Sequence, residues 1–171
     1  INDPRITIIN DFFTENVAQD IISKHGHVDM VLANNVYAHI PDIQGISRAV
    51  HDVLSDDGVF IFEVHYLGNV INELQYDMIY HEHLYYYSLL SAMKHFEWYG
   101  MMVFDVKEVP IHAGSMRFYV CKQGSKYGGV VSPAVIRLQN EELAKKFHLI
   151  ETFTRFAEDI AERKTVLMDL L

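Results

Sequence analysis

The chain has 171 residues, half of them apolar, and its 23 Asp and Glu residues outnumber 14 Lys and Arg residues to give a net charge of −9. This composition predicts a folded domain with a hydrophobic core, and the acidic balance argues against nucleic acid as a partner because affinity for phosphate backbones comes mainly from Lys and Arg. No apolar run reaches about 18 residues, and the single cysteine excludes an internal disulfide framework and a Cys-rich zinc site, so we expect no membrane partner and a reducing, cytoplasmic location.

The first half of the chain alternates strand and helix patterns. Apolar and β-branched runs predict buried strands at residues 5–9, 28–33 and 59–64. Helical spacing of apolar residues predicts one helix that begins after Thr14 and ends near Gly26, and a second over residues 43–54, followed by a turn at 56–58. This order predicts βαβ units on a parallel sheet, and the continuous apolar content of the strands predicts a sheet covered on both faces.

The pattern changes in the middle of the chain. Residues 70–76 predict a short helix, and Ser88 is expected to cap a further helix that is closed by Gly100. Two strands with no helix between them follow, and their short connection predicts an antiparallel pair at residues 101–109 and 115–121.

The last part of the chain reads as a loop and then one long helix over residues 133–171, with an apolar stripe along one side. Helices of more than about 25 residues are unusual in a compact domain. We therefore expect this helix either to pair with a partner subunit, which gives a homo-oligomer, or to lead into a further domain.

Ligands of open α/β sheets bind beyond the carboxyl ends of the strands. Three segments are expected at that edge: residues 10–12, 34–39 and 63–66. Their polar and aromatic side chains fit a small-molecule cleft. The alternative is that Asp11 and Asn35 only end strands and cap helices, and that His39 only caps the following turn.

The densest chemical signal is the run Tyr80-His81-Glu82-His83. Two imidazoles, a carboxylate and a phenol support proton transfer near neutral pH, and a carboxylate can fix the tautomer of a neighbouring imidazole. On an extended backbone these side chains alternate between two faces, so a shared site needs a bend or the exclusion of one member. The alternative is a polar segment that only packs its aromatic rings.

Two other functions stay open on the residues alone. His81, Glu82 and His83 are metal-ligand types, although their spacing does not match the helical His-Glu-x-x-His signature and no cysteine assists them. The chain could also be a non-catalytic α/β domain whose long helix mediates association.

Four segments resemble one family of enzymes. They are residues 29–41 with the run Ala-Asn-Asn-Val-Tyr-Ala-His-Ile-Pro, residues 57–63, the Tyr-His-Glu-His run with the Tyr-Ser pair that follows it, and residues 109–117. In this order they resemble the S-adenosylmethionine-dependent nucleotide-sugar C-methyltransferases typified by the tetronitrose-pathway sugar 3-C-methyltransferase. The resemblance covers most of residues 5–125 and corresponds to the middle portion of such an enzyme.

The resemblance implies an α/β fold: the later half of a class I methyltransferase Rossmann-like sheet, with parallel strands and a terminal antiparallel pair, followed by a long C-terminal helix. It implies a partial Rossmann-like domain over residues 1–125, and a linker and helix over 126–171 that lead toward a further C-terminal domain. The implied reaction is the deprotonation of a nucleotide-linked keto sugar beside its carbonyl and methylation of the enolate by S-adenosylmethionine.

By motif match, the resemblance also implies residue roles. His83 is the general base, and Tyr80, Glu82 and His39 align the substrate and the base or stabilise the enolate. The residues implied for the cofactor are Asp11 and Phe12 at the adenine and Asn34 and Asn35 near the methyl donor. Substrate contacts are expected from Tyr66, His112 and Arg117.

Members of this family carry a Cys-rich zinc-binding segment before the Rossmann domain and a Gly-rich loop after its first strand, and neither pattern occurs in these 171 residues. We expect zinc only in that segment and no metal in this chain. The sequence therefore predicts a fragment that neither binds S-adenosylmethionine well nor turns over by itself.

Overall fold

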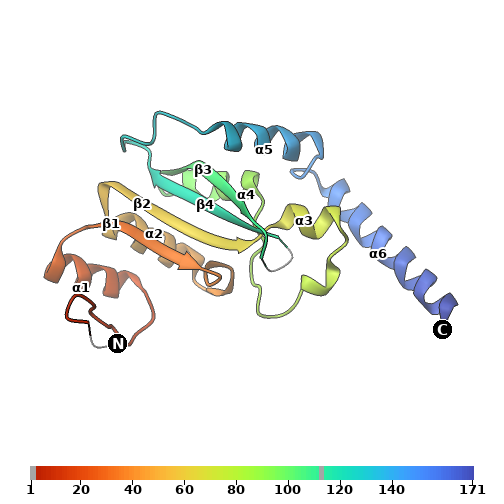
Figure 1. Ribbon diagram of the computed structural model, residues 1–171, viewed down its shortest axis with the longest axis horizontal. Helices are drawn as coiled ribbons and strands as arrows, with labels where there is room; N and C mark the ends of the chain where they lie inside the picture. The colour runs from red at the N-terminus through yellow and green to blue at the C-terminus, as the bar shows by residue number, and fades with distance from the viewer. Residues whose placement is uncertain (1–2, 112–113) are drawn as a thin grey trace.

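The computed structural model of the protein describes residues 3–111 and 114–171. Within these residues a four-stranded mixed sheet has the order β1-β2-β4-β3 (Figure 1). β1 and β2 are parallel, whereas β4 runs antiparallel to both of its neighbours. The strands are β1 (Val28–Asn34), β2 (Leu54–His65), β3 (Met101–Val109) and β4 (Ser115–Lys122). The predicted α/β fold, with parallel strands and a terminal antiparallel pair, is confirmed.

Helix α1 (Glu15–His25) begins and ends at the predicted residues. The side-chain oxygen of Thr14 accepts a hydrogen bond from a backbone N–H of the first turn, and Gly26 ends the helix with a φ of +81°. Ala18 is the fully buried residue of this helix and packs against α2.

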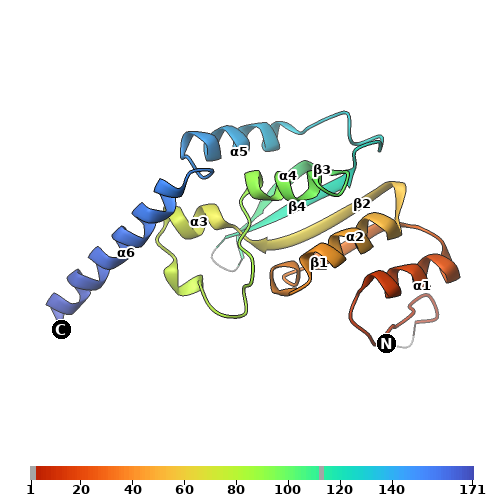
Figure 2. The same cartoon turned by 180° about the vertical axis from the view of Figure 1, so that it is seen from behind.

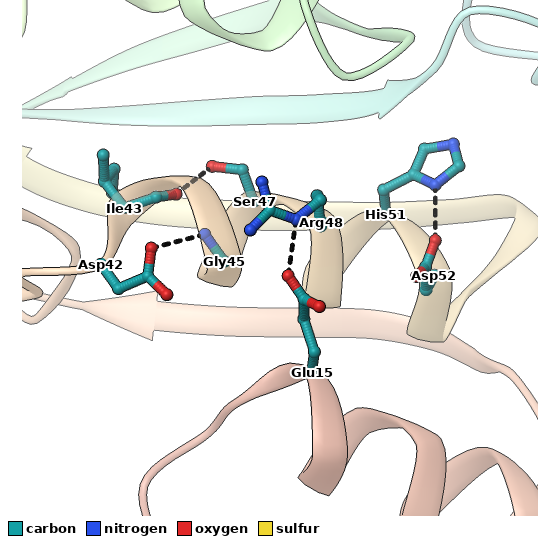
Figure 3. A network of polar contacts seen from close by, with 8 residues as sticks. All are labelled: Glu15, Asp42, Ile43, Gly45, Ser47, Arg48, His51 and Asp52. Carbon is teal, nitrogen blue, oxygen red and sulfur yellow. Dashed lines mark hydrogen bonds and ion pairs between the residues drawn. The ribbon is translucent and has the colours of Figure 1, made fainter.

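Helix α2 (Ile43–Val53) connects β1 to β2 and is fixed by polar contacts at its start (Figure 3). Asp42 Oδ1 accepts the N–H of Gly45 at 2.9 Å, which caps the first turn. Arg48 Nε donates to Glu15 Oε1 at 2.5 Å and ties α2 to the beginning of α1. The two helices of the first half therefore form one unit beside β1.

The middle of the chain contains the short helix α3 (Leu67–Asn72), a 3₁₀ turn η2 (Tyr76–Met78) and helix α4 (Leu89–Glu97). Ser88 caps α4 as predicted, in a reciprocal arrangement with Ser91. Gly100, with a φ of +66°, lies between α4 and β3.

The core lies on one face of the sheet. The strands lie in front of α2 and α4 in Figure 1, and both helices lie in front of the strands in Figure 2. Aromatic rings fill this layer, and Phe62 and Phe118 stack across β2 and β4 with centroids 4.7 Å apart. On the opposite face, Met30 and Leu32 of β1 are 55% and 61% exposed. The prediction of a sheet covered on both faces is therefore wrong for the described residues, because the helices gather on one side.

One polar network is buried in this core. Tyr37, which is fully buried, places its hydroxyl 2.8 Å from Ser47 Oγ, and His95 Nε2 lies 2.8 Å from the same Ser47 oxygen. Burial lowers the pKa of His95 below its ordinary value. The network joins η1 (Tyr37–His39), α2 and α4, so the three elements share one set of hydrogen bonds.

This network predicts a loss of stability in acid. The folded protein binds a proton at His95 less readily than the unfolded chain does, so the His95 contribution to the free energy of unfolding falls as the pH drops below the ordinary histidine value of about 6.5 and levels off below the lowered pKa. Urea denaturation at pH 7 and pH 5 measures the difference. His95→Gln is expected to make that difference smaller, and an unchanged difference would contradict the assignment.

Two predicted local features are wrong. Residues 5–9 form no strand: Ile6, Ile8 and Ile9 are all about half exposed or more, and the segment pairs with no described strand. A β-branched run makes a strand only where a neighbour supplies ladder hydrogen bonds. Residues 56–58 do not separate a helix from a strand, because β2 already starts at Leu54 and the extra residues form an irregularity opposite β1.

The predicted single C-terminal helix is also interrupted. The structure has α5 (Pro133–Ala144) and α6 (Ile150–Leu170), separated by a short loop. Lys146 in this loop has a φ of +59°, and Phe147 turns inward to become 6% exposed. α6 projects from the body (Figure 1), and its pairing with a second copy stays a prediction. None of the described helices meets the length and hydropathy needed to cross a membrane.

The left-handed backbone of Lys146 gives a simple stability prediction. Lys146→Gly is expected to raise the free energy of unfolding by about 0.5–1 kcal/mol, because glycine adopts this conformation without the steric cost of a Cβ atom. Lys145→Gly is the matched control: Lys145 has a helical φ of −79°, and the substitution should lower stability by a similar amount. Chemical denaturation of both variants measures the effect, and equal changes in both would refute the explanation.

Helix α5 is anchored by a buried carboxylate. Glu142 is 1% exposed; its Oε1 accepts the N–H of Leu89 at 2.6 Å and the Tyr66 hydroxyl at 2.8 Å, and its Oε2 accepts the N–H of Leu90 at 2.8 Å. These N–H groups are the first two of α4, which have no partner within their own helix. Glu142 therefore joins α5 to the start of α4 and to the residue that follows β2.

Candidate active site

A polar pocket of about 230 Å³ lies where β1 and β2 end. Its walls come from the ends of both strands, from η1 and from the segment between η2 and α4 that carries the Tyr-His-Glu-His run. The lining residues are Asn35, Ala38, His39, Val64, His65, Met78, Tyr80, Glu82 and His83. The carboxyl edge of the parallel strands thus holds all four side chains for which the resemblance implies a catalytic role.

The backbone bends at the Tyr-His-Glu-His run. The N–H of His83 donates to the carbonyl of Tyr80 at 3.1 Å, so the four residues form a turn. The bend brings the Tyr80 hydroxyl to 3.1 Å from His83 Nε2. Among the described residues, Tyr80, Glu82 and His83 line the pocket and the exposed His81 does not. The sequence pattern required either a bend in the backbone of this run or the exclusion of one residue from the site. The structure shows both, because the backbone turns and His81 does not line the pocket.

His39 lies on the other side of His83. The ring centroids of His39 and His83 are 4.9 Å apart. His39 Nδ1 is 2.8 Å from the backbone carbonyl of Glu82, an acceptor, so Nδ1 carries a proton and Nε2 is free to face a ligand. Glu82 therefore orients His39 through its backbone carbonyl. A hydrogen bond from the N–H of Leu84 to the carbonyl of Ala38, at 2.9 Å, holds the two segments together.

The electrostatics favour a neutral His83. Burial lowers the pKa of His83 below its ordinary value, and the nearby imidazoles of His39 and His65 lower it further. The backbone carbonyl of Met78 and the carboxylate of Glu82 act in the opposite direction. A neutral imidazole that accepts a hydrogen bond from a phenol is in the form that can take a proton.

Asn35 lines the same pocket and has a left-handed backbone conformation. Its φ is +51°, and its N–H donates to the carbonyl of Glu63 at 2.9 Å, so the left-handed turn is fixed by the end of β2. Such conformations cost free energy in residues other than glycine and gather at functional sites. The geometry turns the chain from β1 into the pocket wall.

A second, larger cavity lies beside the first. It is a mainly apolar groove of about 890 Å³ between the start of α1, the end of β1 and α2. Phe12 and Phe13 lie at its N-terminal wall, and Asp42 and Arg48 add charged groups. Phe12 is 87% exposed. An open groove with aromatic and charged walls fits a ligand that combines a flat ring with polar groups.

One segment separates the two cavities. Within residues 35–40, Asn35, Ala38 and His39 line the polar pocket, while Val36, Tyr37 and Ile40 line the groove. A ligand in the groove and a ligand in the polar pocket would therefore contact opposite sides of the same six-residue wall, residues 35–40.

The remaining predicted site residues are spread more widely. Asp11 accepts the N–H of Phe12 through its side chain, and Asn34 is exposed at the end of β1. Tyr66 is buried, with its hydroxyl on Glu142, and burial raises its pKa. Arg117 is committed to Glu63, with Nη2 and Oε2 2.7 Å apart. His112 lies outside the described residues.

His65 is the titratable residue of the pocket lining to which the sequence analysis gave no role. It is the last residue of β2, is 7% exposed and lines the pocket beside His83. Its position after an apolar strand, at the predicted ligand edge, is the signal that could have identified it.

Metal binding finds no support in the geometry. Within residues 3–111 and 114–171, no three histidine, cysteine or acidic side chains are arranged to hold an ion. The turn also directs His81 away from the pocket that His83 lines.

Two family models match this chain over consecutive ranges. The methyltransferase domain family matches residues 1–103, and the C-methyltransferase C-terminal domain family matches residues 110–171. C-methyltransferase NovU of Streptomyces niveus is 32% identical over 170 residues, which cover 99% of this chain and 40% of that protein. The chain thus spans less than half the length of this curated relative.

Similar solved structures are more distant. The complex between the Haloferax volcanii Trm112 methyltransferase activator and a methyltransferase matches with a TM-score of 0.45 and 14% identity, over 56% of this chain and 55% of that one. M1.HpyAVI with SAM matches with a TM-score of 0.41 and 10% identity, over 67% and 55%. These two likenesses are too weak to carry an argument. The methyltransferase match spans more than half of the chain, and the chain therefore belongs to the methyltransferase family, in the group in which a C-methyltransferase C-terminal domain follows the methyltransferase domain.

Proposed function

We propose that the protein takes part in the S-adenosylmethionine-dependent C-methylation of a nucleotide-linked keto sugar, with His83 as the general base. The observation that carries this proposal is the pairing of the Tyr80 hydroxyl with His83 Nε2, 3.1 Å apart, in a pocket at the carboxyl edge of the parallel strands. Methylation at carbon needs a carbanion, and a base beside a hydrogen-bond donor is what forms and stabilises one from a ketone.

The groove fits the cofactor of this reaction. S-adenosylmethionine supplies an electrophilic methyl group, and its adenine is a flat ring that apolar and aromatic walls accept. Phe12 and Phe13 offer such walls, and Asp42 and Arg48 offer charged partners for the polar parts. Asn35 lines the polar pocket, in the segment whose neighbours Val36 and Tyr37 line the groove, and can orient a group of the bound sugar.

Each side chain of the pocket then has its own role in the reaction. His83 Nε2 takes the proton beside the sugar carbonyl, and its lowered pKa keeps it neutral and ready at physiological pH. The Tyr80 hydroxyl, released from His83, donates to the developing enolate oxygen. His39, held by the carbonyl of Glu82, presents its free Nε2 to a sugar hydroxyl. Methyl transfer itself needs mainly positioning.

The related protein supports the reaction type. C-methyltransferase NovU bears C-methyl transfer in its name, and its match extends along nearly the whole of this chain. The keto sugar is chosen because the pocket contains proton-transfer groups, which methyl transfer to an already nucleophilic oxygen or nitrogen needs less.

The test uses the protein expressed from its complete reading frame. It is incubated with S-adenosylmethionine labelled with ¹³C at the methyl group and with a panel of nucleotide-linked keto sugars. The expected product shows a new ¹³C methyl signal bonded to carbon. Methyl transfer to oxygen or nitrogen only, or none with any keto sugar, would overturn the proposal.

A further inference from the structure

His65 is the last residue of β2 and lines the polar pocket. It pairs with Ser115 of β4 in the sheet, is 7% exposed and lines the same 230 Å³ pocket as His39, Tyr80 and His83. A histidine at this depth costs free energy unless its ring nitrogens find partners. The contacts of its two nitrogens therefore decide what it does.

The Nε2 atom of His65 is held by a chain of side chains. Gln75 Nε2 donates to Glu73 Oε2 at 2.6 Å, which turns the Gln75 carbonyl oxygen toward His65. That oxygen, Oε1, lies 3.2 Å from His65 Nε2. Because an amide oxygen only accepts, Nε2 of His65 must carry the proton. The Glu73–Gln75 pair thus sets both the tautomer and the orientation of the ring.

The Nδ1 atom of His65 is buried and has no hydrogen-bond partner among the described residues. An unpaired buried polar atom costs about 1–3 kcal/mol, and such atoms in native proteins call for an explanation. Phenylalanine at this position would avoid that cost while filling the same space. A role for the imidazole beyond packing explains why the cost is tolerated.

The neighbour of His65 in the pocket is His83. The two rings are stacked, with centroids 6.4 Å apart and an angle of 27° between their planes. On its other sides His83 meets His39, Tyr80 and Tyr86, with ring centroids at 4.9, 4.4 and 5.6 Å. The charged group on its own segment is Glu82. Of the rings that surround His83, His65 is thus the one that belongs to a strand of the sheet.

We propose that His65 is a positioning residue for His83. The His65 ring, held by the sheet, fixes the plane of the His83 imidazole and keeps a second basic ring beside it. His83 therefore meets the substrate neutral and in one orientation. The role rests on the proposed function of His83 as a base. The influence of His65 on His83 acts in the same direction as burial.

The test is an NMR titration of the histidine ring signals, with His83→Gln used to assign His83. In the wild-type protein we expect contacts between ring protons of His65 and His83, and a ¹⁵N signal that places the proton of His65 on Nε2. In His65→Phe and His65→Asn the titration midpoint of His83 should rise by roughly half a pH unit. The control is His51→Phe, which replaces a half-buried histidine of α2 next to Asp52 and should leave the His83 midpoint unchanged.

Activity measurements separate the two proposals. In the complete protein, His65→Phe should move the acid limb of kcat/KM to higher pH by the same amount and lower kcat, with little change in KM. A missing ring contact in the wild-type protein, or an unchanged His83 midpoint in either folded variant, overturns the inference even if methylation is found. The NMR shift without any methylation overturns the proposed function and leaves the contact intact.

Discussion

His83→Gln is expected to lower kcat for methyl transfer by about 10²–10⁴-fold in the complete protein. Glutamine can still bond to the Tyr80 hydroxyl, which lies 3.1 Å from His83 Nε2, but it cannot take a proton. The KM for S-adenosylmethionine should change little, because His83 lines the polar pocket and not the groove. The measurement is the initial rate with saturating cofactor, as a function of pH.

The pH profile sharpens this prediction. In the wild-type protein the acid limb of kcat/KM should have its midpoint below the ordinary histidine pKa of about 6.5, since burial lowers the pKa of His83. His83→Gln should lose that acid limb. The matched control is His81→Gln, a histidine in the same turn that is exposed and outside the pocket. If both variants keep the wild-type rate, His83 is not the base.

Glu142→Ala is expected to lower the free energy of unfolding by about 3 kcal/mol, the largest stability effect that we anticipate for a polar residue here. Removing the carboxylate leaves the N–H groups of Leu89 and Leu90 and the hydroxyl of Tyr66 without their acceptor in a buried place. It also removes a negative charge from the N-terminus of α4, where it is favourable. Urea denaturation followed by circular dichroism gives the value.

The neighbouring residue supplies the control for Glu142. Glu141 is exposed on the same helix, and its carboxylate lies 3.7 Å from Arg137, a long ion pair. Glu141→Ala should change stability by less than about 0.5 kcal/mol. Equal effects of the two substitutions would show that the buried hydrogen bonds of Glu142 contribute nothing of their own.

The elements that sequence patterns could predict are those with both a periodic core face and a clear boundary residue. β3 and β4 lie within one residue of their predicted ranges, and Thr14, Gly26 and Ser88 bound their helices as expected. Apolar spacing and capping are local properties, so local sequence carries them.

The wrong structural predictions share one cause, which is a dependence on contacts that local sequence does not carry. Residues 5–9 have strand composition without a partner strand among the described residues. The helical pattern after Pro133 continues through a loop in which Lys146 is left-handed and Phe147 is buried. Glu142 fits the charged side of a helix in sequence, yet it is buried by its contact with α4. Each depends on a segment distant in sequence.

In the candidate site, too, local sequence indicated the chemistry but not the contacts between distant segments. The spacing of Tyr80 and His83 indicated proton chemistry, but only the turn shows that these two meet while His81 is excluded. His65 was placed at the ligand edge within residues 63–66 but received no role, because its contact with His83 joins residues 18 positions apart in the chain.

The six-residue wall between the two cavities has a consequence for chemical probes. A single molecule that joined an adenine-like ring to a sugar-like group would reach over residues 35–40 and place one end on each side. Linking two weak ligands in this way makes the second contact intramolecular and can raise the combined affinity by orders of magnitude. The shortest linker that keeps both ends bound would report the distance between the two binding sites.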